Sequence, residues 1–444
     1  MTMVDASGVQ EAILTTLLTS GSATILATLF GVPLGAWCSA RKGPMFERLR
    51  IAVTALYGLP PVVVGVFVYS MLSKSGMFGG LDLLFTVEAM IIAQTCLIFP
   101  LLWGGSWSAF DSVATRYKDT LDTLGATPRQ RFAMEIRLAR TGVYHAIVIG
   151  FGRAIAEVGA VIMVGGNIAG QTRVMTTSIV LETSKGNMDD AALLGWLLLL
   201  FSLSLVGLAS LVRRPWPKPK AEFHGAAPPP LISYEGPGLH RVGVERDGRV
   251  LLQPLDVKLK SGTITVVLGE SGSGKTSLLR CLAGLEDVSV PCGFQRCSYV
   301  PQAPVSLTGN VAEELDLVSK LFPQAPLSGT YYRNAFSLGV EASQAPERIS
   351  GGELQRLVLA RQLAFAPSLL LLDEATANLG GMHVKAIEDE LIRHRDAGCC
   401  IVLATHNVLQ AKRLADEMII LHEGGSLDGE SQQAKALLEG TWPI

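Results

Sequence analysis

Long runs of apolar residues fill the first half of this chain, whereas the second half alternates short apolar runs with polar stretches. The long runs are residues 13–37, 51–72, 83–103, 144–165 and 191–212. Each is long enough to cross a hydrocarbon core as a helix, which takes about 20 apolar residues. The pattern therefore predicts about five membrane-spanning helices in residues 1–212.

The second half has the pattern of a different kind of domain. From residue 231 to residue 444, short apolar runs typical of buried strands alternate with helical patterns. This order predicts an α/β sheet, with a helical insert between residues 302 and 350. Residues 213–230 are rich in proline and basic residues, which predicts a semi-rigid linker between the two domains.

Basic residues indicate the orientation in the membrane. They gather after the first, third and fifth apolar runs, at Arg41, Lys42, Arg48 and Arg50, at Arg116, Lys118, Arg129, Arg131, Arg137 and Arg140, and at Arg213, Arg214, Lys218 and Lys220. Loops with such an excess stay in the cytoplasm. The first run is long and follows Asp5 and Glu11 rather than a basic leader, which favours a retained span over a cleaved signal sequence. We expect the N-terminus outside and residues 213–444 inside the cell.

Composition narrows the class of protein only slightly further. The 444 residues are 49% apolar and carry a net charge of -2, so the charge gives no indication of nucleic-acid binding. The 7 cysteines are scattered along the chain. Cys292 and Cys297 lack a second pair of ligands, so reduced thiols are favoured over a metal site.

A glycine-rich loop introduces the first candidate chemistry. It comprises Gly269, Glu270, Ser271, Gly272, Ser273, Gly274, Lys275, Thr276 and Ser277, and it follows an apolar strand pattern at 263–268. Glycines let backbone N–H groups close on phosphates, the lysine reaches the terminal phosphates, and the threonine hydroxyl can hold Mg2+. The loop therefore predicts ATP and Mg2+ as cofactors, with an ordinary strand-to-helix turn as the alternative.

Three further motifs make a chance turn a poor explanation. They are ISGGELQR at 349–356, LLLLDEAT at 369–376, and His406 after the apolar run 399–405. Asp373 ends an apolar strand and is expected to hold Mg2+ through water. Glu374 is expected to orient and deprotonate the attacking water.

Together the four motifs resemble an ABC-type ATPase. The resemblance implies that Gln302 reaches Mg2+ and the attacking water, and that His406 contacts the γ-phosphate rather than filling a core position. In this family the signature motif closes the nucleotide of the other subunit, so a homodimer is expected. The signature residues are Ser350, Gly351, Gly352 and Glu353, whose glycines supply donors at a helix N-terminus.

Three departures from the family pattern concern the same domain. Near the position of the adenine-stacking aromatic stand Arg246, Asp247 and Gly248, and Arg246 is the alternative stacking residue. Gly380 replaces the aspartate through which the two nucleotide sites communicate, and the stretch 276–302 is short. Because the catalytic residues remain, we expect an active ATPase.

Residues 119–140 resemble the EAA loop of ABC importer permeases, in which a short helix docks on the ATPase. Asp119 stands where glutamate is usual, Gly125 matches the central glycine, and Phe132 belongs to the apolar tail. The resemblance implies that this loop couples the two domains. The alternative is an amphipathic basic loop on the membrane surface.

Residues 150–187 contain charges and small residues at membrane depth. Arg153 and Glu157 are one helical turn apart and are expected to neutralise each other. A face suited to close helix contact is predicted at Gly152, Ala156, Gly159 and Ala160. Polar donors between residues 167 and 178 either escort an oxyanion or form an ordinary polar hairpin.

This segment resembles permeases of the tungstate uptake family, relatives of the molybdate and sulfate systems. The resemblance implies a bacterial inner-membrane importer of tungstate, supplied by an extracytoplasmic binding protein. Molybdate or sulfate uptake is one alternative, and a membrane ATPase that senses a ligand without transport is another. The predicted spans argue against a soluble ABC protein acting on ribosomes or DNA, and they predict membrane lipid, not nucleic acid, as a partner.

Overall fold

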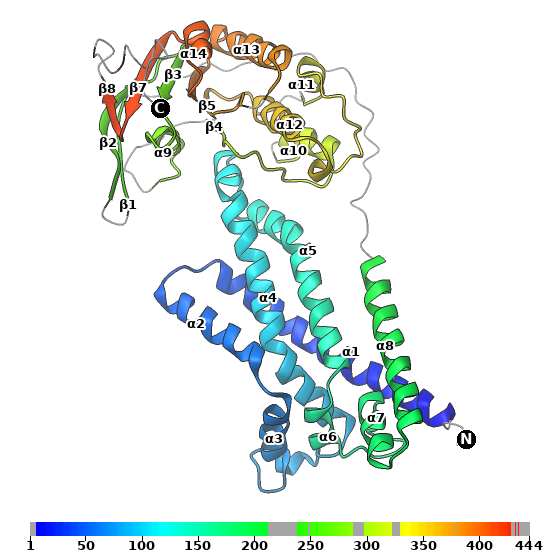
Figure 1. Cartoon of the computed structure of the whole chain (residues 1–444). Coiled ribbons are helices and arrows are strands. Elements are labelled where there is room, and N and C mark those ends of the chain that lie inside the picture. The colour runs from blue at the N-terminus through cyan, green and yellow to red at the C-terminus, as the bar shows by residue number, and fades with distance from the viewer. Residues whose placement is uncertain are drawn as a thin grey trace. The chain divides into compact units, whose positions relative to one another are not determined.

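The computed structural model describes residues 6–427 except 212–237, 247–248, 287–296, 322–328 and 378, together with residues 431 and 434. The chain forms two compact units (Figure 1). The permease unit comprises Met1–Thr115 and Glu135–Pro215, and the ATPase unit comprises Arg116–Met134 and Trp216–Ile444. The predicted linker 213–230 lies outside the described residues. The limits 1–212 and 231–444 stay predictions.

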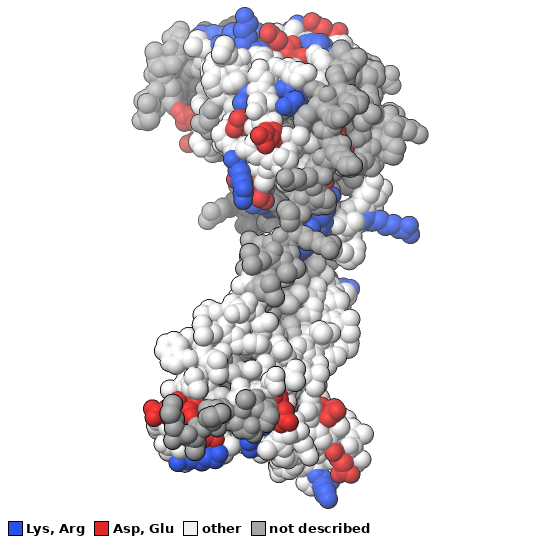
Figure 2. Space-filling view, turned by 90° about the vertical axis from the view of Figure 1, so that its right-hand side faces the viewer, with Lys and Arg blue, Asp and Glu red and all other residues white. Residues whose placement is uncertain are grey.

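The permease unit is entirely helical in its described part (Figure 1). Its α-helices are α1 (Ala6–Ser39), α2 (Pro44–Ala55), α3 (Pro61–Leu72), α4 (Val87–Thr123), α5 (Pro128–Ile155), α6 (Gly159–Gly165), α7 (Met175–Ser184) and α8 (Met188–Leu211), and α4 and α5 extend into the ATPase unit. Short 3-10 helices lie at Leu56–Gly58 and Gly79–Leu81. Figure 2 shows mostly uncharged side chains along the middle of this unit, as a lipid-facing surface requires.

Two of the five predicted spans are broken. In the described part of the chain, Gly8–Ser39, Val87–Thr123 and Met188–Gly207 are each long and apolar enough to cross a membrane. The number rises to 5 if each of two bent helix pairs counts as one span. Pro44–Gly58 meets Pro61–Leu72 at 97°, and Pro128–Ile155 meets Gly159–Gly165 at 58°. The apolar runs 51–72 and 144–165 are therefore not single straight helices.

The first break has a plain chemical cause. Pro60 has no N–H to donate, and its ring excludes the helical conformation for Leu59. Pro60 is extended, with φ -63° and ψ 128°, and α3 restarts at Pro61, where the missing N–H costs nothing. The hydropathy pattern does not reveal this helix break, because both prolines lie inside an apolar run.

At the second break a buried carboxylate takes an unexpected role. Helix α5 ends at Ile155, and Glu157 Oε1 accepts a hydrogen bond from Ala160 N at the start of α6 (3.0 Å). Glu157 is only 6% exposed, and no ion pair joins it to Arg153, although both residues are described. The predicted mutual neutralisation is wrong, because the helix ends before the two side chains come one turn apart.

Small residues do allow close helix contact, but only over part of the predicted face. A Cβ on Gly65 of α3 would lie 2.8 Å from Ala160 Cα, and one on Gly159 would lie 2.8 Å from Val62 Cγ2. A Cβ on Gly152 would meet nothing within 4 Å, and Ala156 is exposed. Helices α3 and α6 therefore pack through Gly159 and Ala160, and the other half of the predicted face has no such partner here.

The described residues of the ATPase unit form two sheets (Figure 1). Strands β1 (Leu239–Arg246) and β2 (Arg249–Lys258) pair antiparallel. The second sheet has the order β4-β5-β6-β3-β7-β8, and only β8 is antiparallel to its neighbour. Its strands are β3 (Ile264–Gly269), β4 (Cys297–Val300), β5 (Leu369–Asp373), β6 (Cys400–Thr405), β7 (Glu417–His422) and β8 (Gly425–Leu427).

Both faces of the larger sheet are covered. Leu370 and Leu372 pack in one apolar core and Leu369 and Leu371 in the other, so the four leucines of β5 alternate between its two faces. The helices α9 (Lys275–Leu282), α12 (Gly351–Ala364), α13 (Gly381–Asp396) and α14 (Val408–Leu414) contact strands of this sheet. Helices α10 (Val311–Leu321) and α11 (Gly329–Ala335) pack on α12, and a 3-10 turn lies at Pro346–Arg348. Helices α10 and α11 form the predicted insert. The predicted fold class, a helical permease followed by an α/β ATPase domain, is confirmed.

Candidate nucleotide-hydrolysis site

The glycine-rich loop joins the end of β3 to the start of α9. Gly272 and Gly274 have φ of 84° and 99°, a region that favours glycine. A Cβ on Gly269 would lie 2.5 Å from both Leu421 O and Ser273 Oγ. The loop can therefore close only with glycines, and it leaves backbone N–H groups at the N-terminus of α9, where an anion is favoured.

Lys275 lies folded back into this loop. Its Nζ donates to Gly269 O (2.8 Å) and Glu270 O (2.6 Å), and the residue is only 6% exposed. Burial lowers the pKa of Lys275, although Glu374, Asp373 and Glu270 act in the opposite direction. A buried amine held by neutral carbonyls is suited to a stronger acceptor, such as a phosphate oxygen.

Thr276 and Asp373 provide the oxygen atoms for a cation. Thr276 Oγ1 donates to Asp373 Oδ2 (2.8 Å), and Tyr299 Oη donates to the same oxygen at 3.4 Å. Burial raises the pKa of Asp373, and the hydrogen bond from Thr276 opposes that shift. Hydroxyl and carboxylate oxygens beside a phosphate loop fit Mg2+, which takes few protein ligands and keeps several waters.

Glu374 lies where two predicted partners meet. Gln302 Nε2 donates to its Oε2 (3.2 Å), and His406 Nδ1 lies 3.2 Å from its Oε1. Its φ of 49° is strained for a residue with a long side chain. The structure thus brings together Glu374, Gln302 and His406, which lie up to 104 residues apart in the sequence.

Two glutamines of this region were missed by sequence reasoning. Gln355 Nε2 donates to Glu374 O (3.2 Å). Gln410 Oε1 accepts from Thr376 Oγ1 (3.0 Å) and Thr405 Oγ1 (3.2 Å), so it ties the turn after Glu374 to the strand that precedes His406. The available signal was position: Gln355 lies inside the motif at 349–356, and Gln410 follows His406 by four residues.

The signature residues form a helix cap. Ser350 is the N-cap of α12, its Oγ accepts from Glu353 N (3.3 Å), and Glu353 Oε2 accepts from Ser350 N (2.9 Å). Hydrogen bonds to its carboxylate from Ser350 Oγ (2.7 Å) and from Ser350 N lower the pKa of Glu353. A Cβ on Gly351 would meet nothing within 4 Å. In the part of the chain that the structure describes, no hydrogen bond or ion pair joins residues 350–353 to the loop 269–277.

Residues 119–134 of the predicted coupling loop belong to the ATPase unit, and residues 135–140 belong to the permease unit. Asp119 Oδ2 forms an ion pair with Arg280 of α9, whose Nε donates to Glu286 Oε1 (2.6 Å). Burial alone would lower the pKa of Arg280, but the hydrogen bonds to Glu286 and Asp119 outweigh it and raise the pKa. Asp119 therefore reaches the helix that begins at Lys275.

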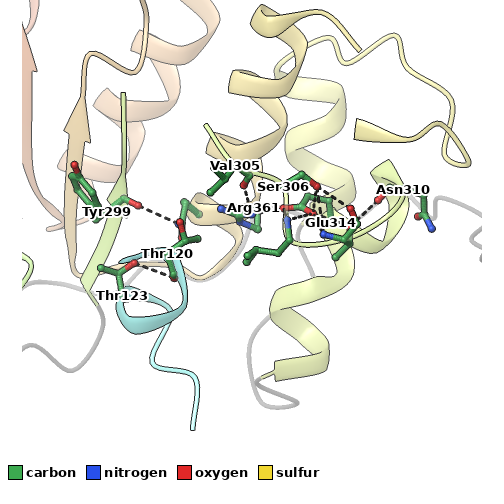
Figure 3. Close-up of polar contacts among 11 residues, drawn as sticks. Thr120, Thr123, Tyr299, Val305, Ser306, Asn310, Glu314 and Arg361 are labelled. Carbon is green, nitrogen blue, oxygen red and sulfur yellow. Dashed lines mark hydrogen bonds and ion pairs between the residues drawn. The ribbon is translucent and has the colours of Figure 1, made fainter. Parts of the chain in front are cut away.

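The rest of the coupling loop is built by a glycine turn. Gly125 has φ of 67° and donates from N to Asp122 O (3.0 Å), so α4 ends in a left-handed turn. Asp122 also pairs with Arg131 (2.8 Å). Figure 3 shows Thr120 and Thr123, from the end of α4, beside Tyr299. Phe132 is 55% exposed, so its predicted apolar role has no partner among the described residues.

The departures from the family pattern are only partly visible. Asp247 and Gly248 lie outside the described residues, as does the side chain of Arg246, and so does Cys292. Gly380 is the N-cap residue of α13 and brings no side chain to the site. Three residues later, His383 Nδ1 accepts from Arg356 Nη1 of the signature helix (2.7 Å). The described cysteines are free thiols.

Two family models match this chain. Residues 31–214 match the binding-protein-dependent transport system inner membrane component, and residues 252–292 and 295–377 match the ABC transporter family. The two matches fall on the two kinds of domain that the sequence predicts. A membrane permease and an ATPase that powers transport are therefore joined in one polypeptide.

Curated relatives match each half separately. A probable anion ABC transporter permease of Haloferax volcanii is 37% identical over 202 residues, 44% of this chain and 87% of the relative. The tungstate uptake permease TupB of Peptoclostridium acidaminophilum is 38% identical over 186 residues, 42% of this chain and 82% of the relative. The ATP-binding protein TupC of that tungstate system is 32% identical over 199 residues, 41% of this chain and 93% of the relative.

These matches confirm the predicted family, the ATPase activity coupled to transport, and a multi-pass location in the inner membrane with a cytoplasmic ATPase domain. The ABC ATPase domain binds ATP. The chain belongs to the ABC importer family of these permease and ATP-binding proteins, with both parts fused.

Proposed function

We propose that this importer takes up an oxyanion, and that the oxyanion is tungstate. The observation that carries the proposal is the 38% identity to the tungstate permease TupB, because the permease forms the path that the substrate crosses. The relationship of the ATPase half to TupC supports the same system. Molybdate and sulfate remain the competing substrates.

Hydrolysis is assigned to the cluster around Glu374. Its carboxylate is held by Gln302 and His406 and accepts a proton from the attacking water. The loop 269–277 and Lys275 bind the phosphates, and Thr276, Gln302 and Asp373 would hold Mg2+. When bound, that ion neutralises charge on the phosphates.

A homodimer completes the site. The chain has one phosphate loop and one signature, and no hydrogen bond or ion pair brings the described residues of the two together. The cap of Ser350 and Glu353 leaves the N–H groups of Gly351 and Gly352 at a helix N-terminus, suited to the γ-phosphate of a second subunit. ATP would then join the two copies, and hydrolysis would release them.

The coupling loop carries the movement to the permease. Asp119 pairs with Arg280 on the helix that starts at the phosphate-binding Lys275. A change in α9 on nucleotide binding therefore reaches α4 through one charge pair. This contact favours the docking interpretation over a loop lying on the membrane surface.

Substrate recognition is assigned to an extracytoplasmic binding protein. The donors predicted near residues 167–178 are engaged locally: Thr172 Oγ1 accepts from Ile168 N (3.0 Å), and Arg173 Nε donates to Asn167 Oδ1 (3.3 Å). Thr176 Oγ1 donates to Glu157 O (2.9 Å). These contacts favour the polar-hairpin alternative for the segment. A dianion is costly to desolvate, so tight selection belongs to a dedicated binding site.

The test compares three oxyanions. With the cognate binding protein, ATPase activity of the reconstituted full chain should rise most with tungstate, less with molybdate and not with sulfate at matched concentration. Stimulation by sulfate alone, or by a cationic solute, contradicts the substrate assignment. Stimulation without accumulation of the anion in vesicles would instead favour the ligand-sensing alternative.

A further inference from the structure

The signature helix α12 holds the chain on both sides of Gln302. Arg361 Nη1 donates to Val305 O (3.1 Å), and Gln362 Nε2 donates to Tyr299 O (3.2 Å). The two carbonyls lie three residues after and three residues before Gln302. Arg361 and Gln362 are both 0% exposed. The backbone that carries Gln302 is therefore fastened at both ends to a single helix.

Glu314 of α10 strengthens one of these attachments. Its fully buried carboxylate accepts from Ser306 Oγ (2.9 Å), Leu307 N (3.0 Å) and Thr308 N (2.9 Å). Thr308 Oγ1 donates to it as well (2.8 Å), and Arg361 forms an ion pair with it. Figure 3 shows Ser306 and Arg361 converging on Glu314, with Val305 beyond the guanidinium. Glu314 thus orients Arg361 and fixes residues 306–308.

The pair is poorly arranged as a purely stabilising contact. Arg361 Nε and Nη2 have no hydrogen-bond partner among the described residues. A buried ion pair loses much of its attraction to desolvation, and apolar residues of similar volume are often as stable in its place. Its geometry is directed instead at a backbone segment, which suggests a gain in position rather than in stability.

The same helix also contacts the backbone of Glu374. Gln355, two residues after the signature, donates to Glu374 O, so α12 contacts the backbone at Glu374 and on both sides of Gln302. A helix of 14 residues moves as one body. Its N-terminus carries Ser350, so a displacement there moves all three contacts together.

We propose that Arg361, braced by Glu314, and Gln362 are positioning residues that tie Gln302 to the signature helix. Engagement of the signature by a second subunit's nucleotide then sets Gln302 against Glu374 in the same chain. This link serves a chain in which Gly380 replaces the aspartate expected to connect the two sites. The inference rests on the roles of Gln302, Glu374 and the signature in the proposed function.

The test uses a paired apolar replacement, because removing one charge alone leaves the other buried and can unfold the protein. In the full chain in nanodiscs, Glu314→Leu with Arg361→Met should lower kcat for ATP about tenfold and leave KM within about twofold. The thermal midpoint also falls, because the N–H groups of Leu307 and Thr308 lose their acceptor, so kcat is measured well below that midpoint. Gln362→Met should change kcat in the same direction. The matched control Tyr332→Phe removes a buried hydrogen bond to His394 (2.8 Å) and should lower the midpoint with kcat unchanged.

A mutant cycle with Gln302→Ala separates positioning from structure. If Arg361 and Glu314 act through Gln302, adding the paired replacement to Gln302→Ala lowers kcat no further. If the paired replacement and Gln302→Ala lower kcat multiplicatively, the inference is overturned. A normal kcat in the paired variant, together with a low kcat in Gln302→Ala, overturns it as well. Those two results leave the proposed function standing. A normal kcat in Gln302→Ala would overturn both the inference and the role proposed for Gln302.

Discussion

The ATPase unit and the permease unit use buried polar groups in opposite ways. In the ATPase unit, Asp373 ends β5 and Glu374 follows it, with Lys275 nearby, so several charges face one site. In the permease unit, Glu157 caps α6, and Gln94 Nε2 donates to Ala154 O (3.1 Å) near the end of α5. Asp373, Glu374 and Lys275 therefore gather at one reaction site, whereas Glu157 and Gln94 form hydrogen bonds with backbone groups at a broken helix.

This difference separates specificity for the nucleotide from specificity for the transported substrate. The ATPase unit concentrates groups whose chemistry is specific to a nucleotide, and it can be recognised without knowing what is transported. In the permease unit, the buried Glu157 and Gln94 form hydrogen bonds with backbone groups of the same unit. We propose that coupling depends on the loop that contains Asp119, which pairs with Arg280. The following predictions separate hydrolysis, nucleotide binding, coupling and stability.

The largest effect is expected at Glu374. Glu374→Gln removes the proton acceptor for water while the phosphate contacts remain, so ATP should bind and kcat should fall by at least about 100-fold. Turnover and nucleotide affinity are measured in nanodiscs, with the exposed Glu417→Gln as control. Near-normal turnover of Glu374→Gln would show that another group activates the water.

Lys275→Ala should instead weaken nucleotide binding. The amine now held by Gly269 O and Glu270 O is lost, so the Kd for ATP should rise by about tenfold or more. Binding of a fluorescent ATP analogue measures the change, and the exposed Lys258→Ala serves as the matched control. An unchanged Kd would remove Lys275 from the phosphate site.

Gly125 tests coupling separately from hydrolysis. Valine is strained at φ of 67°, whereas asparagine tolerates it. We expect Gly125→Val to lower transport about tenfold with basal ATPase activity within about twofold, and Gly125→Asn to keep both. Equal loss of transport and ATPase activity in a folded Gly125→Val protein would argue against a coupling role.

The smallest effect concerns stability and pH. Burial lowers the pKa of His394 to about 3, so the folded chain keeps it neutral while the unfolded chain binds a proton below its usual pKa of about 6.5. Between these values the unfolded state binds more protons, so stability falls as the pH falls, by at most about 1.4 kcal/mol per pH unit. The loss of thermal midpoint between pH 6.5 and 4.5 should shrink in His394→Phe. An identical pH dependence in the two proteins would contradict this assignment.

The sequence was informative where chemistry depends on residues close together in the chain. The phosphate loop, the pair Asp373 and Glu374, and the helix cap at Ser350 are local patterns, and the structure forms each of them. The contacts of Gln355 and Gln410 depend on tertiary packing and could not be predicted. Hydropathy found the apolar runs but not their breaks, because it does not register what Pro60 and Glu157 do to backbone hydrogen bonding.

Uptake in proteoliposomes tests the central claim most directly. The full chain is reconstituted with its binding protein outside and ATP inside, and labelled tungstate is followed beside matched vesicles that contain Glu374→Gln. The account predicts tungstate accumulation that requires ATP and the binding protein and is absent with Glu374→Gln. ATP hydrolysis by the wild-type chain without accumulation of tungstate, molybdate or sulfate would contradict it.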